Sequence, residues 1–95
     1  MRKYESMLVF NPELTEEQAE KENQSFLGLV KDEGGEILET TKWGKRKLAY
    51  EIKKKREGYY FVNNYKVDPL KIEEIERHLR ISEPVLRYNI LSEND

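Results

Sequence analysis

Positive charge gathers in one short segment of this chain, residues 42–56, where eight of fifteen residues are Lys or Arg. Around it, residues 41–66 hold nine Lys or Arg against two Asp or Glu, whereas residues 1–40 hold four against ten and residues 67–95 hold four against seven. Lys and Arg at this density neutralise phosphates, so they predict the binding of a polyanion. We expect this otherwise acidic protein to meet nucleic acid through its basic segment.

The basic residues form two clusters on one predicted hairpin, with Lys42 and Lys45–Lys47 preceding Lys53–Arg56. A solvated hairpin whose lysines protect an edge strand from aggregation is the simpler interpretation. This interpretation explains the cluster at the turn but explains the cluster before it less well. Two basic clusters on one ribbon make a stripe that can follow a phosphate backbone, which favours nucleic-acid binding. Arg2 and Lys3 at the start of the first strand and Arg87 early in the last strand are weaker candidates. The two strands should be neighbours in the sheet, but their antiparallel pairing need not bring these residues to the same end. The predicted RNA contacts are Arg2, Lys3, Arg46, Lys47, Lys53, Lys54, Lys55, Arg56 and Arg87.

Residues suited to catalysis are present but form no recognisable site. His78 is the only histidine, and no motif pairs it with a Ser or Cys nucleophile. Asn11-Pro12-Glu13 stands where a glycine-rich phosphate loop would follow the first strand. The chain has no cysteine, which excludes zinc held by thiolates. The sequence therefore predicts no catalytic site, no metal site, no cofactor and no small-molecule substrate.

Aromatic residues follow the basic segment, and residues 56–62 partly match the signature of RNA-recognition motifs, whose sheet aromatics stack on bases. The match fails at Tyr60, where Gly or Ala is expected, and at Asn64, where an aromatic is expected. Tyr60 and Val62 are instead expected to leave a small apolar patch on the face away from the helices, which suits a protein partner. Alternation assigns the neighbouring set to the core: Tyr59, Phe61, Tyr65 and Val67.

The chain of 95 residues fits one domain, residues 1–95, so the helices and strands of that one domain must position these residues. Residues 15–18 form a capping box that begins a helix, and Gly34-Gly35 ends it. Gly44 predicts a bend or bulge in a long strand, and Asp68-Pro69 caps a second helix. The expected elements are a strand at 4–10, a helix to about residue 32, a strand at 36–52, a connection at 53–57, a strand at 59–67, a helix ended by residues 82–84 and a strand at 85–91.

The expected element order is therefore β-α-β-β-α-β. Right-handed crossovers and short connections favour a ferredoxin-like α+β fold, a four-stranded antiparallel sheet with two helices on one face. The second face of the sheet is then bare unless a partner covers it. No apolar run suits a signal peptide or a membrane-spanning helix, so the expected location is the cytoplasm.

The run WGKRKLAYEI at residues 43–52 resembles the bacterial ribosomal protein six family of the small subunit. The resemblance covers nearly the whole chain, and its other pieces are weak singly but strong in their order. One departure is the C-terminus, since some members carry a long acidic tail that this sequence does not show. The other matching pieces are Met1–Glu5, Asn11-Pro12, Gly58-Tyr59, Leu79–Ile81 and Val85–Tyr88.

The resemblance implies a ferredoxin-like ribosomal protein without enzymatic activity. It also implies binding to the central domain of small-subunit ribosomal RNA, as a heterodimer with small-subunit ribosomal protein eighteen, a basic protein that would complement the acidic remainder of this chain. The positions that it assigns to RNA are Arg2, Lys3, Lys54 and Arg87. The residues that we predict to contact the protein partner are Trp43, Tyr50, Tyr60 and Val62.

Two alternatives stay open on the sequence alone. The first is a stand-alone domain that binds single-stranded RNA through aromatics of the sheet. The second is a small phosphate-ester hydrolase on the same fold, as acylphosphatases are, although the missing phosphate loop argues against it.

Overall fold

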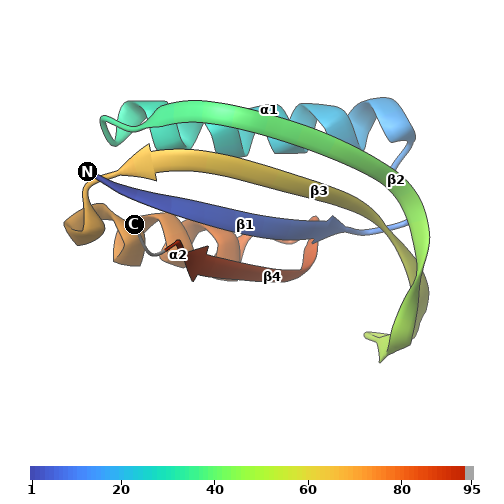
Figure 1. Cartoon of the computed structure of the whole chain (residues 1–95). Coiled ribbons are helices and arrows are strands. Elements are labelled where there is room, and N and C mark those ends of the chain that lie inside the picture. The colour runs from blue at the N-terminus through green and yellow to red at the C-terminus, as the bar shows by residue number, and fades with distance from the viewer. Residues whose placement is uncertain (94–95) are drawn as a thin grey trace.

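The computed structural model describes residues 1–93 and contains one four-stranded antiparallel sheet with the strand order β2-β3-β1-β4 (Figure 1). The expected β-α-β-β-α-β order and ferredoxin-like fold are confirmed. No helix within the described residues is long and apolar enough to cross a membrane. The elements are β1 (Arg2–Phe10), α1 (Glu16–Asp32), β2 (Glu36–Ile52), β3 (Lys55–Val67), a 3-10 turn (Pro69–Lys71), α2 (Ile72–Ile81) and β4 (Val85–Ser92).

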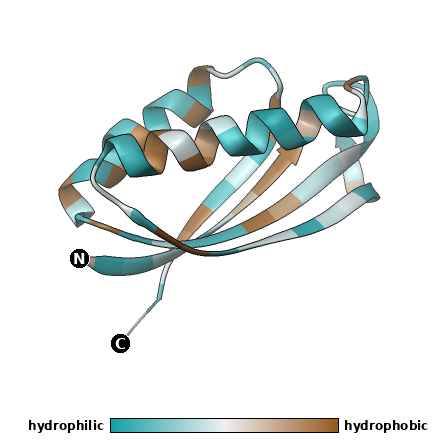
Figure 2. Ribbon diagram, turned by 90° about the horizontal axis from the view of Figure 1, so that it is seen from above, coloured by the Kyte–Doolittle hydropathy of each residue, from teal (hydrophilic) through white to brown (hydrophobic). Residues whose placement is uncertain are grey.

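The core lies between the sheet and the two helices, which cover the same face of the sheet (Figure 2). Leu8, Phe61 and Ile75, from β1, β3 and α2, are 0%, 3% and 0% exposed. Burial raises the pKa of Tyr65 to about 12. The alternation predicted for β3 is confirmed, since the core cluster contains Tyr59, Phe61, Tyr65 and Val67.

Helix α1 begins and ends where the local sequence predicts. The Thr15 hydroxyl accepts from the Gln18 backbone N–H at 3.1 Å, and the Gln18 side chain accepts from the Thr15 N–H at 2.8 Å. At the other end, Gly34 has φ 83° and donates to the Lys31 carbonyl, while Gly35 donates to the Val30 carbonyl. Six-to-one and five-to-two bonds of this kind form a Schellman motif, which satisfies the last carbonyls of a helix.

Gly35 and Gly28 give a matched pair of alanine substitutions with opposite expected signs. A Cβ at Gly35 would lie 2.8 Å from the carbonyl oxygens of both Val30 and Lys66. Because backbone atoms cannot move aside cheaply, Gly35→Ala should lower the free energy of unfolding by about 1–3 kcal/mol. A Cβ at Gly28, inside α1, meets nothing within 4 Å, so Gly28→Ala should raise that free energy by about 0.5–1 kcal/mol. Urea unfolding measures the free energy of unfolding of both variants. Changes of the same sign in the two variants would contradict this account.

A polar pair lies in the apolar layer between α1 and β3. Asn23 and Asn63 are 1% and 0% exposed. Their amides bond reciprocally, with Asn23 Nδ2 donating to Asn63 Oδ1 at 3.1 Å and Asn63 Nδ2 donating to Asn23 Oδ1 at 2.8 Å. In the sequence Asn63 only interrupts an apolar alternation; the fold supplies its partner from 40 residues away.

The β2–β3 connection is shorter than expected. We expected it to span residues 53–57, but the turn is only Lys53 and Lys54, and β3 already begins at Lys55. Both turn residues have positive φ, 49° and 66°. A two-residue turn of this kind matches the right-handed twist of the strands, although residues other than Gly and Asn adopt positive φ at a cost.

Strand β2 is irregular at two further places that shape the hairpin. The predicted bulge at Gly44 is confirmed, because Gly44 has φ 80° and the pairing with β3 shifts between Lys42 and Gly44. Further along, the pairing passes from Lys47–Glu57 directly to Ile52–Lys55. Residues 48–51 of β2 therefore lie opposite Arg56 alone. Insertions of this kind bend a ribbon and increase its twist.

Candidate nucleic-acid and protein interface

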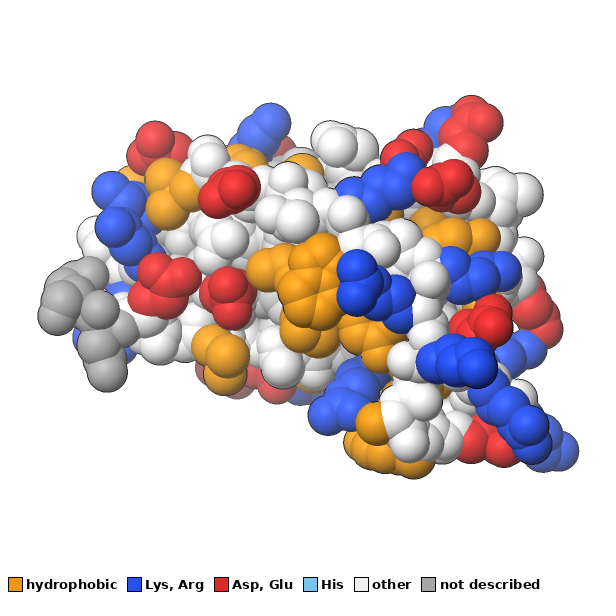
Figure 3. Space-filling view, turned by 45° about the vertical axis from the view of Figure 1, so that its right-hand side comes forward, with side chains coloured by type: hydrophobic (Ala, Val, Ile, Leu, Met, Phe, Trp, Pro, Cys, Tyr) orange, Lys and Arg blue, Asp and Glu red, His pale blue; other side chains and the backbone are white. Residues whose placement is uncertain are grey.

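The β2–β3 hairpin projects beyond the rest of the sheet. Strand β1 pairs with β3 only as far as Phe10–Tyr59, so residues 46–58, here called the hairpin arm, form a two-stranded ribbon that bends away from the sheet (Figure 1). Lys and Arg side chains gather on this side of the molecule, beside apolar side chains (Figure 3). Six of the predicted RNA contacts lie on the arm: Arg46, Lys47, Lys53, Lys54, Lys55 and Arg56.

The cations of the hairpin arm differ in how freely they can bind a ligand. Lys47, Lys53 and Lys54 are exposed and form no ion pair with any residue in 1–93. Lys55 pairs with Glu13, in the loop before α1. Arg56 Nε lies 3.7 Å from Glu51 Oε2, and the Arg56 side chain is 87% exposed. Exposed pairs contribute little, so a phosphate can compete for Arg56, whereas Lys55 is half-buried beside Glu13 and less accessible.

Two members of the first basic cluster, Lys42 and Lys45, lie outside the hairpin arm and contact other parts of the protein. Lys42 reaches α1, where its Nζ lies 2.5 Å from both the Glu16 and the Glu20 carboxylates. The hydrogen bonds to these two carboxylates raise the pKa of Lys42. Lys45 Nζ lies 5.2 Å from the ring centroid of the core residue Tyr59. The expectation that Lys42 continues the basic stripe of the hairpin is not met in this structure, because its side chain is directed to α1 and away from the arm.

The basic residues near the chain ends separate. Arg2 pairs with Val67 at the far end of the sheet from the hairpin arm. Eight residue steps along β1 separate Arg2 from Phe10, which at about 3.3 Å each is roughly 26 Å. Arg87 pairs with Val9, next to the arm. The fold thus brings Arg87 to the arm, and it leaves Arg2 and Lys3 remote from it.

The face of the sheet opposite the helices, here called the open face, carries an aromatic stack. The rings of Trp43 and Tyr60 are 6.1 Å apart and inclined by only 16°. Arg46 lies over the Trp43 ring at 5.1 Å and donates from Nε to the Trp43 carbonyl at 3.3 Å. Trp43 is 41% exposed, whereas Val62 is 8% exposed. The expectation that Val62 stands out in an apolar patch is wrong, because the chain itself already covers its side chain.

Tyr50 and Arg87 meet although the sequence places them 37 residues apart. Arg87 Nη1 donates to the Tyr50 hydroxyl at 2.8 Å, and the guanidinium carbon lies 5.5 Å from the ring centroid. Tyr50 is 61% exposed. One residue predicted to bind RNA and one predicted to bind a protein thus touch each other, and no local sequence signal could have shown that.

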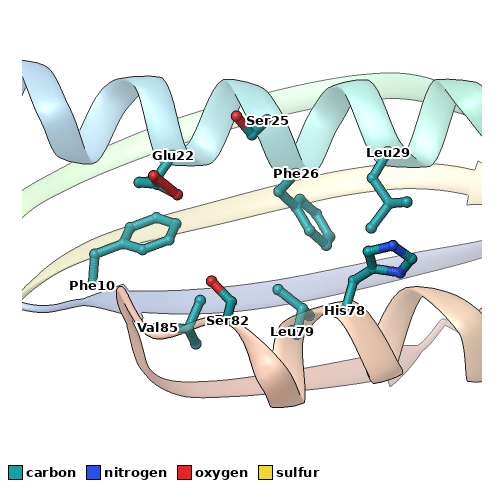
Figure 4. Close-up of a pocket in the computed structure, with 9 residues that line it drawn as sticks. All are labelled: Phe10, Glu22, Ser25, Phe26, Leu29, His78, Leu79, Ser82 and Val85. Carbon is teal, nitrogen blue, oxygen red and sulfur yellow. The ribbon is translucent and has the colours of Figure 1, made fainter.

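A hollow between α1 and α2 contains the side chains that come nearest to a catalytic set (Figure 4). Its volume is about 230 Å³, and its polar lining consists of Glu22, Ser25, His78 and Ser82. His78 Nδ1 lies 3.0 Å from the Glu74 carbonyl oxygen, and among residues 1–93 no hydrogen bond joins His78 to either serine. A nucleophile needs an adjacent base, so this geometry offers no catalytic pair.

The loop after β1 is also unsuited to hold a phosphate. The Glu13 N–H donates to the Asn11 side chain at 2.9 Å, and the Leu14 N–H donates to the Asn11 carbonyl at 3.2 Å. Pro12 has no N–H to offer. The backbone donors that a phosphate cradle would need are thus used within the loop. In the described part of the chain, no group of three or more acidic, His or Cys side chains could hold a metal ion.

Comparisons with known proteins agree along the whole chain. Residues 3–92 match the family model described as ribosomal protein S6. The small ribosomal subunit protein bS6 of Carboxydothermus hydrogenoformans is 45% identical over 94 residues, which is 99% of this chain and 98% of that protein. The bS6 of Caldanaerobacter subterraneus subsp. tengcongensis is 46% identical over 95 residues, all of both chains. The crystal structure of 30S ribosomal protein S6 from Thermotoga maritima superposes with a TM-score of 0.92 at 31% identity, covering 97% of this chain and 87% of that one.

Proposed function

The chain belongs to the ribosomal protein S6 family of the small ribosomal subunit, and from this premise we propose that it binds small-subunit ribosomal RNA through the hairpin arm and Arg87. The observation that carries the proposal is the geometry of the arm, a projecting ribbon with Lys47, Lys53 and Lys54 exposed and unpaired within residues 1–93. The proposed role is structural and not enzymatic, with the chain acting as one domain in the cytoplasmic ribosome. It needs no cofactor, metal, membrane or small-molecule substrate.

The proposed binding is electrostatic and reads the shape of the RNA. Lys and Arg neutralise phosphates and release counterions, which fixes position without reading sequence. Folded RNA offers phosphates at set distances around its grooves, so a basic ribbon held in a fixed direction can recognise their arrangement. With about four to six phosphate contacts, the isolated chain should bind weakly and lose affinity steeply as salt rises.

We also propose that small-subunit ribosomal protein eighteen covers the open face of the sheet. Trp43 and Tyr50 supply exposed aromatic area there, with the partly exposed Tyr60 stacked on Trp43, and aromatic residues are enriched where proteins associate. Outside residues 41–66 the chain holds far more Asp and Glu than Lys and Arg, which favours a basic partner. The two proteins together would present a larger and more positive surface to the RNA than either one does alone.

One observation favours a second candidate, a stand-alone domain for single-stranded RNA. The partly exposed Trp43–Tyr60 stack could accept an unpaired base, because every base has a face on which an aromatic ring can stack. The other aromatics of β3, Tyr59 and Phe61, are buried in the core and cannot take part.

A titration separates the two candidates. Binding of the chain to central-domain ribosomal RNA and to an arbitrary single strand is measured with and without protein eighteen, at two salt concentrations. The proposal expects tight binding only to the ribosomal RNA with the partner present, and weak, salt-sensitive binding without it. Tight, partner-independent binding to the arbitrary strand would overturn it in favour of the second candidate.

A further inference from the structure

The hairpin arm has little support of its own. Beyond the Phe10–Tyr59 pair it consists of two strands only, and the pairing of these strands is interrupted where residues 48–51 lie opposite Arg56. A two-stranded ribbon is at best marginally stable in water. Contacts outside the ladder must therefore hold the direction of the arm.

Among residues 1–93, two side-chain contacts join the hairpin arm to elements distant in the sequence, whereas Arg46 reaches only Trp43 on its own strand. Lys55 pairs with Glu13 of the β1–α1 loop, and Tyr50 meets Arg87 of β4. The Lys55–Glu13 pair is open to solvent on its Glu13 side, so salt screens it in part. The Tyr50–Arg87 contact combines a hydrogen bond of 2.8 Å to a charged donor with a cation–π approach of 5.5 Å. Because neither component depends on a second ion, this contact should persist at physiological salt.

We propose that Tyr50 is a positioning residue that holds the hairpin arm against β4 and so sets the spacing between Arg87 and the turn lysines, Lys53 and Lys54. The inference rests on the proposed function. A guanidinium has five N–H donors and Tyr50 accepts from one atom of it, so Arg87 remains able to bind a phosphate. Cations already held at the right spacing lose less entropy when they bind a rigid array of phosphates.

The test uses two substitutions of Tyr50 and one matched control. Tyr50→Leu removes both the hydroxyl and the ring, whereas Tyr50→Phe removes only the hydroxyl. Tyr88→Phe is the control, because Tyr88 is the neighbour of Arg87 on β4 but donates its hydroxyl to Glu76 of α2 at 3.2 Å, away from the arm. None of the three substitutions changes the net charge at neutral pH.

Two measurements are made on each variant. Amide hydrogen exchange of residues 46–58 reports how often the arm opens, while exchange of the β1–β3 amides shows that the core is intact. Affinity for central-domain ribosomal RNA is measured with protein eighteen at a saturating concentration, so that any weaker contact between Tyr50 and that partner does not alter the RNA reading. We expect Tyr50→Leu to speed exchange in the arm and to weaken RNA binding, each by about five- to thirtyfold. Tyr50→Phe should have a smaller effect on both, and Tyr88→Phe should change neither.

The outcomes are distinguishable. Unchanged exchange of the arm in Tyr50→Leu would show that Tyr50 does not hold the arm, which overturns the inference. Faster exchange with unchanged RNA affinity would overturn the positioning role. If the wild-type chain binds no ribosomal RNA even with protein eighteen, the proposed function and the positioning role both fail, and the exchange data still decide whether Tyr50 holds the arm.

Discussion

Replacing Asn63 by leucine should lower the free energy of unfolding by about 2–4 kcal/mol, because Asn23 would lose its only side-chain partner among residues 1–93 while remaining buried. Leucine has the same branched shape as asparagine and bulkier end groups, so the substitution opens no cavity, and the loss comes chiefly from the unpaired amide of Asn23. Chemical denaturation followed by circular dichroism measures the effect.

The double variant Asn23→Leu/Asn63→Leu should recover most of that loss, since replacing both partners leaves no buried amide unpaired. The coupling between the two substitutions should be about 1–3 kcal/mol in favour of the double variant. Asn64→Leu is the matched control, with the same chemical change one residue along β3 at a partly exposed site, and it should stay within about 0.5 kcal/mol of wild type. Simple additivity of the two single changes would show that the reciprocal bonds contribute nothing.

Replacing the turn by Lys53→Asn/Lys54→Gly should change stability and RNA binding in opposite directions. Both lysines have positive φ, and Asn-Gly is the preferred pair in a two-residue turn of this geometry, so the free energy of unfolding should rise by about 1–2 kcal/mol. Two phosphate-binding cations are lost at the same time. Affinity for ribosomal RNA should fall by about tenfold or more, and the slope of log K against log salt should become shallower by roughly 1.5–2.

The control for this change removes two exposed lysines elsewhere, Lys31→Gln/Lys71→Gln, on the helix layer. It alters the net charge equally but should leave the salt slope unchanged. Denaturation with urea and RNA titration at three salt concentrations provide the data. A turn variant that is more stable and binds RNA as well as wild type would exclude the turn lysines from the RNA contact.

The residues of the candidate site were predictable to different extents. The charge pattern alone identified the six cations of the hairpin arm, because charge density is visible in sequence. It could not show that Lys42 turns to Glu16 and Glu20, or that Lys55 pairs with Glu13, since those partners come from other elements. For the same reason the exposure of Val62 was predicted wrongly, as burial depends on neighbours across the sheet.

The sequence by itself determined the order of the elements, the ends of α1, the core-facing set of β3 and the bulge at Gly44. These features depend on capping residues, alternation and glycine, whose effects act over a few residues. Only the tertiary structure decided that Asn23 meets Asn63, that Arg87 joins the arm while Arg2 does not, and that Tyr50 touches Arg87. The physical reason is that strand register, bulges and twist act over distances in the chain that no local pattern records.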